Sequence, residues 1–230
     1  MAEGATTPRD RFREQTRGEI KAIALRQLSE GGIGAIALTR IAKELGLSGP
    51  ALYRYYAGRD ELISELVRDA YDDLAAAVSA PAEPDSPPRA RLLRLGRAYR
   101  AWAREQPHRY LLIFGSPLPG YAAPPDTVAN ARAALEPVVR VFAAARPDQQ
   151  PLVDQLQRWN ERDPAVAAWT GAHVEPAAAG AALAGAVTAL SRLHGIVGLE
   201  VNGQFAGMGH DPGELLDAEL GLLADTYRLP

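Results

Sequence analysis

The sequence contains no cysteine, and this absence excludes several kinds of site. Without thiols there is no disulfide, no iron–sulfur cluster, no zinc finger with thiolate ligands and no cysteine nucleophile. Aromatic residues make up only 7% of the 230 residues, and no apolar run approaches the ~20 residues that span a bilayer. The first segment, MAEGATTPRDRFREQTRGE, is polar and lacks the apolar core of a signal peptide. We therefore expect a cytoplasmic protein without a membrane partner.

Motifs of common enzymes are missing as well. The sequence has no G-x-S-x-G, no H-E-x-x-H and no glycine-rich loop between a strand and a helix. The glycines of SEGGIGAIAL (29–38) follow a helical pattern and are interpreted as the end of that helix. We also find no pair of metal ligands at helical spacing. We expect a protein that is not an enzyme and that needs neither a cofactor nor a metal.

The residues that are present indicate a globular protein with an uneven charge distribution. The apolar fraction is 47%, and the net charge is −3. Residues 1–68 hold 11 Lys or Arg and 9 Asp or Glu, whereas the remainder carries a net charge of −5. A slightly basic N-terminal part permits an anionic partner there, although a charge imbalance of this size also arises by chance on an ordinary surface.

Helical periodicity dominates the chain. The first apolar stripe consists of Phe12, Thr16, Ile20, Ile23, Ala24 and Leu28, and Gly31 and Gly32 end it. A short stripe contains Leu38, Ile41, Ala42 and Leu45, and a long one contains Leu62, Ile63, Leu66, Val67, Ala70, Tyr71, Leu74 and Val78. Alternating β-branched runs are absent, so the sequence predicts an all-α fold.

A proline-rich linker, PAEPDSPP (81–88), separates two predicted domains, because four prolines in eight residues keep the backbone extended. We place a helix-turn-helix domain at 9–58, a connecting helix at 60–79 and a larger helical domain at 86–230. Within the larger domain the pattern predicts helices near 89–105, 107–114, 127–145, 149–160, 163–171, 176–205 and 212–227.

The segment IAKELGLSGPALYRYY (41–56) fits a helix-turn-helix unit in detail. Ala42 is small where the two helices cross, and Gly46 supplies the positive φ of the turn. Ser48 is a good N-cap, and Pro50 falls in the first turn of the next helix, where its missing N–H costs little. The Gly-Pro pair therefore starts a helix, with Leu47 and Leu52 facing the core.

LTRIAKELGLSGPALYRYYAGRDELISELV (38–67) resembles the DNA-binding domain of TetR/AcrR-type transcriptional repressors. The resemblance rests on the small-residue turn, the Leu52-Tyr53 pair and the basic Arg59 before Asp60-Glu61-Leu62, and it covers roughly residues 12–70. The later segment LSRLHGIVGLEVNGQFAGM (190–208) is similar to one subgroup, whose ligand-binding domain carries a Trp/Arg-x-x-His-Gly signature. One departure is Ala37, where the family usually has a Ser or Thr cap; a backbone group or Thr39 is expected to replace it.

The resemblance implies double-stranded DNA as a partner and a recognition helix over 49–55, whose N-terminal part enters the major groove. Arg54 is long enough to reach guanine or a phosphate, and the hydroxyls of Tyr53 and Tyr55 are suited to phosphates. The predicted DNA-binding residues are Arg13, Arg17, Thr39, Arg40, Gly49, Pro50, Ala51, Tyr53, Arg54, Tyr55 and Arg59. Arg13, Arg17 and Lys21 form one helical face that also fits an ordinary solvated surface, and Tyr56 is predicted to be core.

The resemblance also implies a homodimer formed through the last two helices, and the small side chains of AAAGAALAGAVTAL (177–190) favour such close packing. The alternative is a helix buried within one chain. Residues of the larger domain that suit a small-molecule site are Trp102, Tyr110, Phe114, Trp159, Trp169, His173 and His194, although each also suits an ordinary core or helix position.

The sequence thus predicts a repressor that binds a palindromic operator as a dimer and is released by a small, apolar or aromatic effector. A constitutive DNA-binding dimer without an effector, or a helical enzyme, are the alternatives. An enclosed apolar pocket of a few hundred Å3 in the larger domain would distinguish the effector-released repressor from the constitutive dimer.

Overall fold

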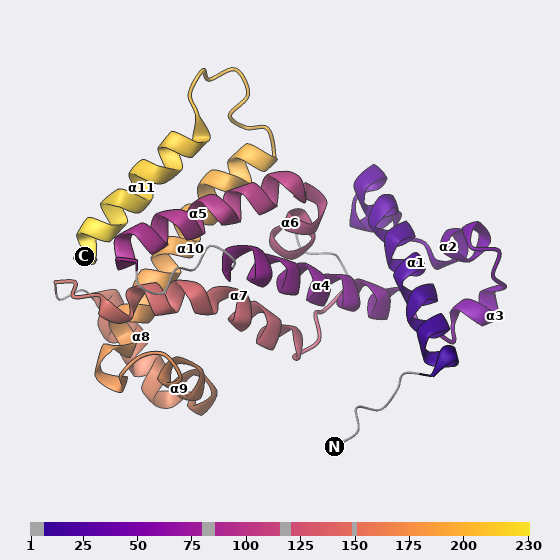
Figure 1. Cartoon of the computed structure of the whole chain (residues 1–230), viewed down its shortest axis with the longest axis horizontal. Coiled ribbons are helices and arrows are strands. Elements are labelled where there is room, and N and C mark those ends of the chain that lie inside the picture. Colours follow the sequence, from indigo (N-terminus) through magenta and orange to yellow (C-terminus); the bar gives the residue numbers. More distant parts are fainter. Residues whose placement is uncertain (1–6, 80–85, 116–120, 149–150) are drawn as a thin grey trace. The chain divides into compact units, whose positions relative to one another are not determined.

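The computed structural model describes residues 7–79, 86–115, 121–148 and 151–230, and every regular element in these ranges is a helix (Figure 1). The all-α prediction is therefore confirmed. The chain divides into two compact units: unit 1 contains Met1–Ala70 and His108–Thr127, and unit 2 contains Tyr71–Pro107 and Val128–Pro230. The predicted linker at 81–88 lies mostly in 80–85, outside the described residues, and helix α4 contributes to both units.

Unit 1 contains the predicted helix-turn-helix segment. Its elements are α1 (Pro8–Gly31), the 3-10 turn η1 (Ile33–Ala35), α2 (Leu38–Glu44), α3 (Gly49–Leu52), the first half of α4 (Arg59–Ser79) and most of α6 (Pro107–Phe114). Helix α1 begins with a capping box, in which Thr7 and Asp10 exchange side-chain to backbone hydrogen bonds. It ends at Gly32, whose φ of +68° confirms the predicted glycine stop.

The core of unit 1 follows the predicted stripes, with one exception. The α1 residues Ile20 and Ala24 are fully buried, as are Leu62 and Ile63 of α4. Phe12, which the periodicity placed on the same stripe, is 66% exposed. That part of the prediction is wrong, because the first two turns of α1 extend beyond the helices that cover its later turns: Thr16 is the first buried residue.

Unit 2 is built around one long helix. Its other elements are α5 (Pro88–Glu105), α7 (Thr127–Val141), η2 (Phe142–Ala144), α8 (Pro151–Arg162), α9 (Pro164–Gly171), η3 (Pro176–Ala178) and α11 (Pro212–Thr226), and α10 (Ala179–Val201) packs on α5, α8 and α11. These helices confirm the predicted ones, although α10 ends at Val201 rather than near 205. Gly203, with a φ of +71°, lies in the turn that follows.

Small residues let the neighbours of α10 approach its backbone closely. A Cβ on Gly185 would overlap the ring of Phe142, which is fully buried and packs edge-on against Tyr227 at 5.2 Å between ring centroids. On α5, a Cβ on Gly96 would overlap the Leu220 side chain of α11. Glycine at these two positions therefore sets the spacing between α10, η2, α5 and α11.

The segment Pro176–Val201 is long and apolar enough to cross a membrane by length and composition. This corrects the expectation that no apolar stretch approaches that length. Half of its most apolar 18-residue window is buried inside the protein, where Ala182, Leu183 and Ala186 lie in the core of unit 2. Because the core helix of a water-soluble protein meets the same two criteria, the segment is weak evidence for a membrane span.

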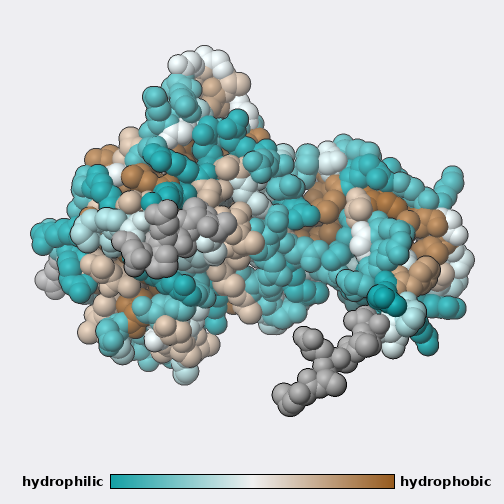
Figure 2. Space-filling view, in the orientation of Figure 1, coloured by the Kyte–Doolittle hydropathy of each residue, from teal (hydrophilic) through white to brown (hydrophobic). Residues whose placement is uncertain are grey.

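Hydrophilic residues cover most of the face seen in Figure 2, and apolar residues appear on it as separate patches over both units. Exposed large apolar side chains include Val187, Leu199 and Leu222 of α10 and α11, which are 43%, 45% and 57% exposed. Single exposed apolar side chains are ordinary on a protein surface.

Candidate nucleic-acid interface

The turn between α2 and α3 has the geometry that the sequence predicts. Gly46 adopts a φ of +66°, in the left-handed region that costs an L-residue about 1–2 kcal/mol. The Leu47 amide then donates to the Ala42 carbonyl at 2.9 Å and closes the end of α2. Ala42 itself is 4% exposed, in agreement with a small residue at the helix crossing. Leu52 is buried as predicted, while Leu47 is only half-buried.

Helix α3 is only four residues long, so its start depends on its caps. Ser48 accepts a hydrogen bond from the Ala51 amide at 3.3 Å, which confirms it as the N-cap. Pro50 occupies the first turn, where its missing N–H is not needed. Gly49 is helical although a proline follows it, a position where a Cβ would clash with the proline ring. The sequence SGP is therefore a compact helix start.

No side chain caps the first turn of α2, and its N-cap residue is held by a residue that sequence reasoning did not identify. Ala37 is the N-cap residue and makes no side-chain cap. Its amide instead donates to Oε1 of Gln27, at 2.9 Å, and Gln27 is only 3% exposed. In the first turn of α2 the Arg40 amide donates to the Ala37 carbonyl at 3.1 Å, so a backbone group takes the capping role, as one of the two expected alternatives, and Thr39 does not. The only signal in the sequence was a polar residue on the buried face of the first helix.

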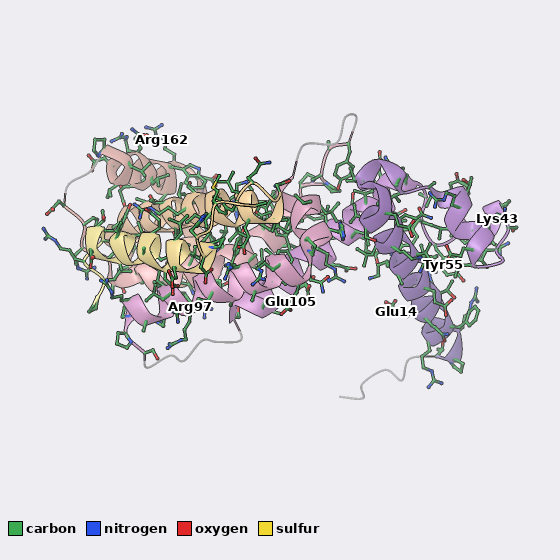
Figure 3. All side chains as sticks on the ribbon, turned by 90° about the horizontal axis from the view of Figure 1, so that it is seen from above. Glu14, Lys43, Tyr55, Arg97, Glu105 and Arg162 are labelled. Carbon is green, nitrogen blue, oxygen red and sulfur yellow. The ribbon has the colours of Figure 1, made fainter. Side chains whose placement is uncertain are left out.

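Most predicted DNA-contact residues are accessible. Those that are exposed are Arg13, Thr39, Arg40, Gly49, Pro50, Tyr53 and Arg54, and those that are half-buried are Ala51 and Tyr55. Tyr53 is 56% exposed, whereas its neighbour Leu52 is 1% exposed. Figure 3 labels Tyr55, just after α3, and Lys43, near the end of α2. The exposed Tyr53 and Arg54 thus come directly after α3, a helix whose start is capped by Ser48.

Two of the predicted contact residues are occupied within unit 1. Arg59 donates from Nε to the Ile36 carbonyl at 2.9 Å and from Nη2 to the Ile33 carbonyl at 2.6 Å, and so ties the start of α4 to the segment before α2. Arg17 donates from Nη1 to the Tyr55 carbonyl at 2.9 Å and forms an ion pair with Glu65. Both guanidinium groups therefore already have partners within unit 1.

Tyr56 belongs to the core, as predicted: it is fully buried, and Arg17 Cζ lies 4.5 Å from its ring centroid. Burial, followed by the negative charge of Glu65, raises the pKa of the Tyr56 hydroxyl well above its ordinary value. The hydroxyl therefore stays neutral at physiological pH. Three tyrosines in four positions thus have different environments, with Tyr53 exposed, Tyr55 half-buried and Tyr56 enclosed.

The residues predicted to bind a small molecule lie in different environments. In unit 2, Trp102 is 5% exposed and its indole N–H donates to Asp73 at 2.9 Å, whereas Trp159 is 43% exposed. Trp169 and His173 are half-buried, and His173 Nε2 lies 3.3 Å from Glu136. His194 is exposed on α10, where Ser191 occupies the first position of the subgroup signature.

Tyr110 and Phe114 belong to unit 1. Tyr110 is 1% exposed, Phe114 is half-buried, and their ring centroids are 5.2 Å apart. The predicted small-molecule residues are therefore divided between the two units. Their role stays a prediction.

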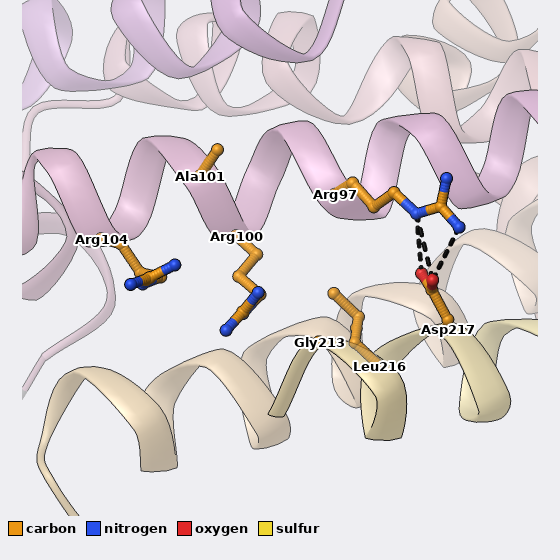
Figure 4. A pocket seen from close by; sticks show the side chains of 7 residues that line it. All are labelled: Arg97, Arg100, Ala101, Arg104, Gly213, Leu216 and Asp217. Carbon is orange, nitrogen blue, oxygen red and sulfur yellow. Dashed lines mark hydrogen bonds and ion pairs between the residues drawn. The ribbon is translucent and has the colours of Figure 1, made fainter. Parts of the chain in front are cut away.

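Unit 2 has a half-open cleft of about 210 Å3 between α5 and α11, and none of the predicted aromatic residues lines it (Figure 4). Its polar lining consists of Arg97, Arg100, Arg104 and Asp217, and the remainder is Ala101, Gly213 and Leu216. Arg97 donates from Nε and from Nη2 to the Asp217 carboxylate, and these hydrogen bonds raise the pKa of Arg97. Arg100 makes paired 2.7 Å hydrogen bonds to Glu200. Because carboxylates neutralise the charge of these arginines, the cleft is a polar, ion-paired contact between helices rather than an apolar pocket.

Two family models match the chain. One, described as bacterial regulatory proteins of the tetR family, matches residues 20–66, and the other, described as a tetracyclin repressor-like C-terminal domain, matches residues 92–223. Together they cover the helix-turn-helix of unit 1 and most of unit 2.

Individual proteins give the same result. The HTH-type transcriptional regulator Rv1816 of Mycobacterium tuberculosis strain H37Rv is 41% identical over 121 residues, so the match spans about half of this chain and half the length of that relative. A crystal structure of SCO4313, described as a regulatory protein, is 42% identical, has a TM-score of 0.78 and covers 95% of this chain and 100% of that one. A tetR-family regulatory protein from Rhodococcus RHA1 is 16% identical with a TM-score of 0.62, over 94% and 98% of the two chains, and shows a similar fold.

Proposed function

Because the chain belongs to the TetR family of bacterial regulatory proteins, we propose that it is a transcriptional repressor that binds operator DNA through α3. The observation that carries this proposal is the exposed Tyr53–Arg54 pair, which directly follows a helix start fixed by Gly46, Ser48 and Pro50. In a helix-turn-helix protein the recognition helix lies in the major groove with its N-terminal residues at the edges of the bases, and the long side chains of Tyr53 and Arg54 extend from the end of that helix.

The exposed residues divide by the contacts they are suited to make. Arg54 is assigned to guanine O6 and N7 or to a phosphate, and the Tyr53 hydroxyl to a phosphate. Gly49 and Ala51 allow the backbone to approach the DNA closely, and Thr39, Arg40, Pro50, Tyr55 and Arg13 surround this surface. Among the residues that the structure describes, Arg40 is paired with Glu30 at 3.9 Å, and because both side chains are exposed this ion pair is weak and the Arg40 charge is available.

A dimer is part of the proposal, because a four-residue recognition helix contacts too few bases to be specific alone. The exposed Val187 and Leu199 on α10 and Leu222 on α11 are suited to a four-helix bundle with a second copy. In such a dimer the two recognition helices must match half-sites separated by about 34–36 Å or a multiple of it. The operator is then a palindrome.

We further propose that a small, apolar or aromatic molecule binds the helical body and releases the DNA, and that the protein acts in the cytoplasm, where the DNA is. Such an effector acts only if it binds the two conformations of the dimer with different affinities. The buried Trp102 and half-buried Trp169 are the residues of unit 2 best suited to contact it. An operator complex that no compound of this class dissociates would favour a constitutive DNA-binding dimer.

The first test is selection of bound fragments from genomic DNA, followed by titration of the selected duplex. Arg54→Ala should weaken binding by about 10-fold or more, since a good bidentate contact contributes about 1–3 kcal/mol. Arg158→Ala on α8 is the matched control, because it removes an exposed arginine and the same charge from unit 2. Equal affinities for these two variants would contradict the contact role of Arg54, and an empty selection would contradict DNA binding.

The dimer is tested by light scattering at micromolar concentration without DNA. Val187→Arg should shift the mass toward that of a monomer, because it places a charge in the proposed interface. Val128→Arg is the control, since Val128 is 49% exposed and Val187 is 43% exposed. A wild-type protein with the mass of one chain would refute the bundle, and identical dimers for both variants would move the interface elsewhere.

A further inference from the structure

We propose that Arg17 and Glu65 form a positioning pair that holds the end of the recognition helix in place and does not contact DNA. The proposal deepens the proposed function and rests on it. It assigns a role to two side chains that lie 48 positions apart in the sequence, on α1 and on α4. It also replaces the direct phosphate contact that the sequence suggested for Arg17.

The pair acts on the backbone directly after α3. The Tyr55 amide donates to the Leu52 carbonyl at 2.9 Å, so Tyr55 continues the last turn of the helix. Its carbonyl accepts the hydrogen bond from Arg17 Nη1 at 2.9 Å. Carbonyl groups at a helix end lack a partner within the helix, and an arginine that supplies one fixes the direction in which the chain leaves.

Arg17 is itself held from three sides. One nitrogen donates to Tyr55, another is paired with Glu65, and the guanidinium lies over the ring of the buried Tyr56. The Arg17 side chain is 22% exposed, and the Glu65 side chain is 16% exposed. Because the planar guanidinium satisfies all three contacts at once, a flexible ammonium group at the same position cannot replace it.

Glu65 is anchored by a second cation. Lys21 Nζ lies 3.2 Å from Glu65 Oε1 and 2.8 Å from Asp69 Oδ2, so α1 and α4 are joined at two successive turns. Burial alone would raise the pKa of Glu65, but the hydrogen bond from Lys21 and the charge of Arg17 outweigh it and lower the pKa. Glu65 is therefore a carboxylate at neutral pH. The ion-pair network of Lys21, Glu65 and Asp69 is thus connected to the end of the recognition helix by the hydrogen bond from Arg17 to the Tyr55 carbonyl.

Simple electrostatics and the positioning role predict opposite effects for one substitution. Glu65→Gln removes a negative charge from a DNA-binding unit, which by electrostatics alone should strengthen binding to the polyanion. If Glu65 instead holds Arg17 against the Tyr55 carbonyl, the same substitution weakens binding, because the recognition helix loses its fixed orientation. The sign of the change therefore distinguishes the two roles.

The experiment uses the full-length dimer and a fluorescently labelled duplex of the selected operator, titrated at several salt concentrations well below the melting temperature of each variant. Glu65→Gln should weaken binding by up to about 10-fold, because the amide oxygen can still accept from Arg17 but the charge that strengthens the pairing is lost. Glu19→Gln on α1 is the matched control, because Glu19 is exposed and the charge change is identical. The control should bind as tightly as the wild type or slightly more tightly.

Arg17→Lys is the second variant and keeps the charge. A phosphate contact tolerates lysine, whereas removing such a contact altogether lowers the salt slope of binding by about one. The positioning role predicts weaker binding with an unchanged slope, and no additional loss when both substitutions are combined. Should Glu65→Gln fail to fold, the affinity of Arg17→Lys decides the question, because only the positioning role predicts that it falls.

Three outcomes would overturn the proposal: unchanged or tighter binding by Glu65→Gln, full affinity for Arg17→Lys, or additive losses in the double variant. A wild-type protein that binds no duplex would refute the proposed function, and this inference with it. A wild-type protein that binds normally while Glu65→Gln matches Glu19→Gln would refute only the positioning role.

Discussion

Replacing Gly46 by alanine tests whether the turn before the recognition helix depends on its backbone conformation. The φ of Gly46 is +66°, and an added Cβ at this position would meet no atom within 4 Å. Packing therefore does not oppose the substitution, and its effect comes from the backbone alone.

The magnitude follows from two opposing terms. The left-handed conformation costs an L-residue about 1–2 kcal/mol, and the reduced freedom of the unfolded chain returns about 0.4–1 kcal/mol. Gly46→Ala should therefore lower the free energy of unfolding by roughly 1 kcal/mol. Gly18→Ala is the control, because Gly18 is an exposed residue inside α1, also with nothing within 4 Å and without a positive φ. There alanine should raise stability by up to about 1 kcal/mol.

The assay is urea denaturation of the full chain followed by circular dichroism, with amide hydrogen exchange of α2 as a local readout of unit 1. The two variants should deviate from the wild type in opposite directions and differ by about 2 kcal/mol. A Gly46→Ala protein as stable as Gly18→Ala would refute the argument, since it would show that the turn relaxes to a negative φ without cost.

Three further measurements test other parts of the structure. Gly185→Ala should destabilise the protein by about 1–3 kcal/mol, because its methyl group overlaps the Phe142 ring, whereas Gly221→Ala meets only an ordinary contact; equal melting temperatures would contradict this packing. Glu65 has a lowered pKa in the folded state, so its stabilising effect should be complete above about pH 4.5 and disappear as the pH falls through the folded-state pKa; a difference between wild type and Glu65→Gln that persists in acid would contradict this. Ser48→Ala should cost about 1 kcal/mol and weaken DNA binding, and Ser48→Asp should restore the stability but not necessarily the binding.

Much of the candidate interface was readable from the sequence because its determinants are local. A left-handed turn at Gly46, a cap at Ser48 and a proline in the first helical turn each involve residues at most five positions apart. The 3.6-residue periodicity likewise predicted the helices and most of the buried face of α1 and α4. The burial of Tyr56 also followed from its place relative to Leu52.

What the sequence determined by itself was therefore the all-α fold, the helix-turn-helix and the family. The tertiary structure alone decided which polar side chains are available. Gln27 accepts from the amide of Ala37, 10 positions away, Arg59 reaches carbonyl groups 23 and 26 positions before it, and Arg17 meets Tyr55 and Glu65 at separations of 38 and 48. A helical pattern shows that an arginine lies on a polar face. Whether that face meets a carboxylate, a carbonyl group or open solvent depends on how distant helices pack, which local periodicity does not encode.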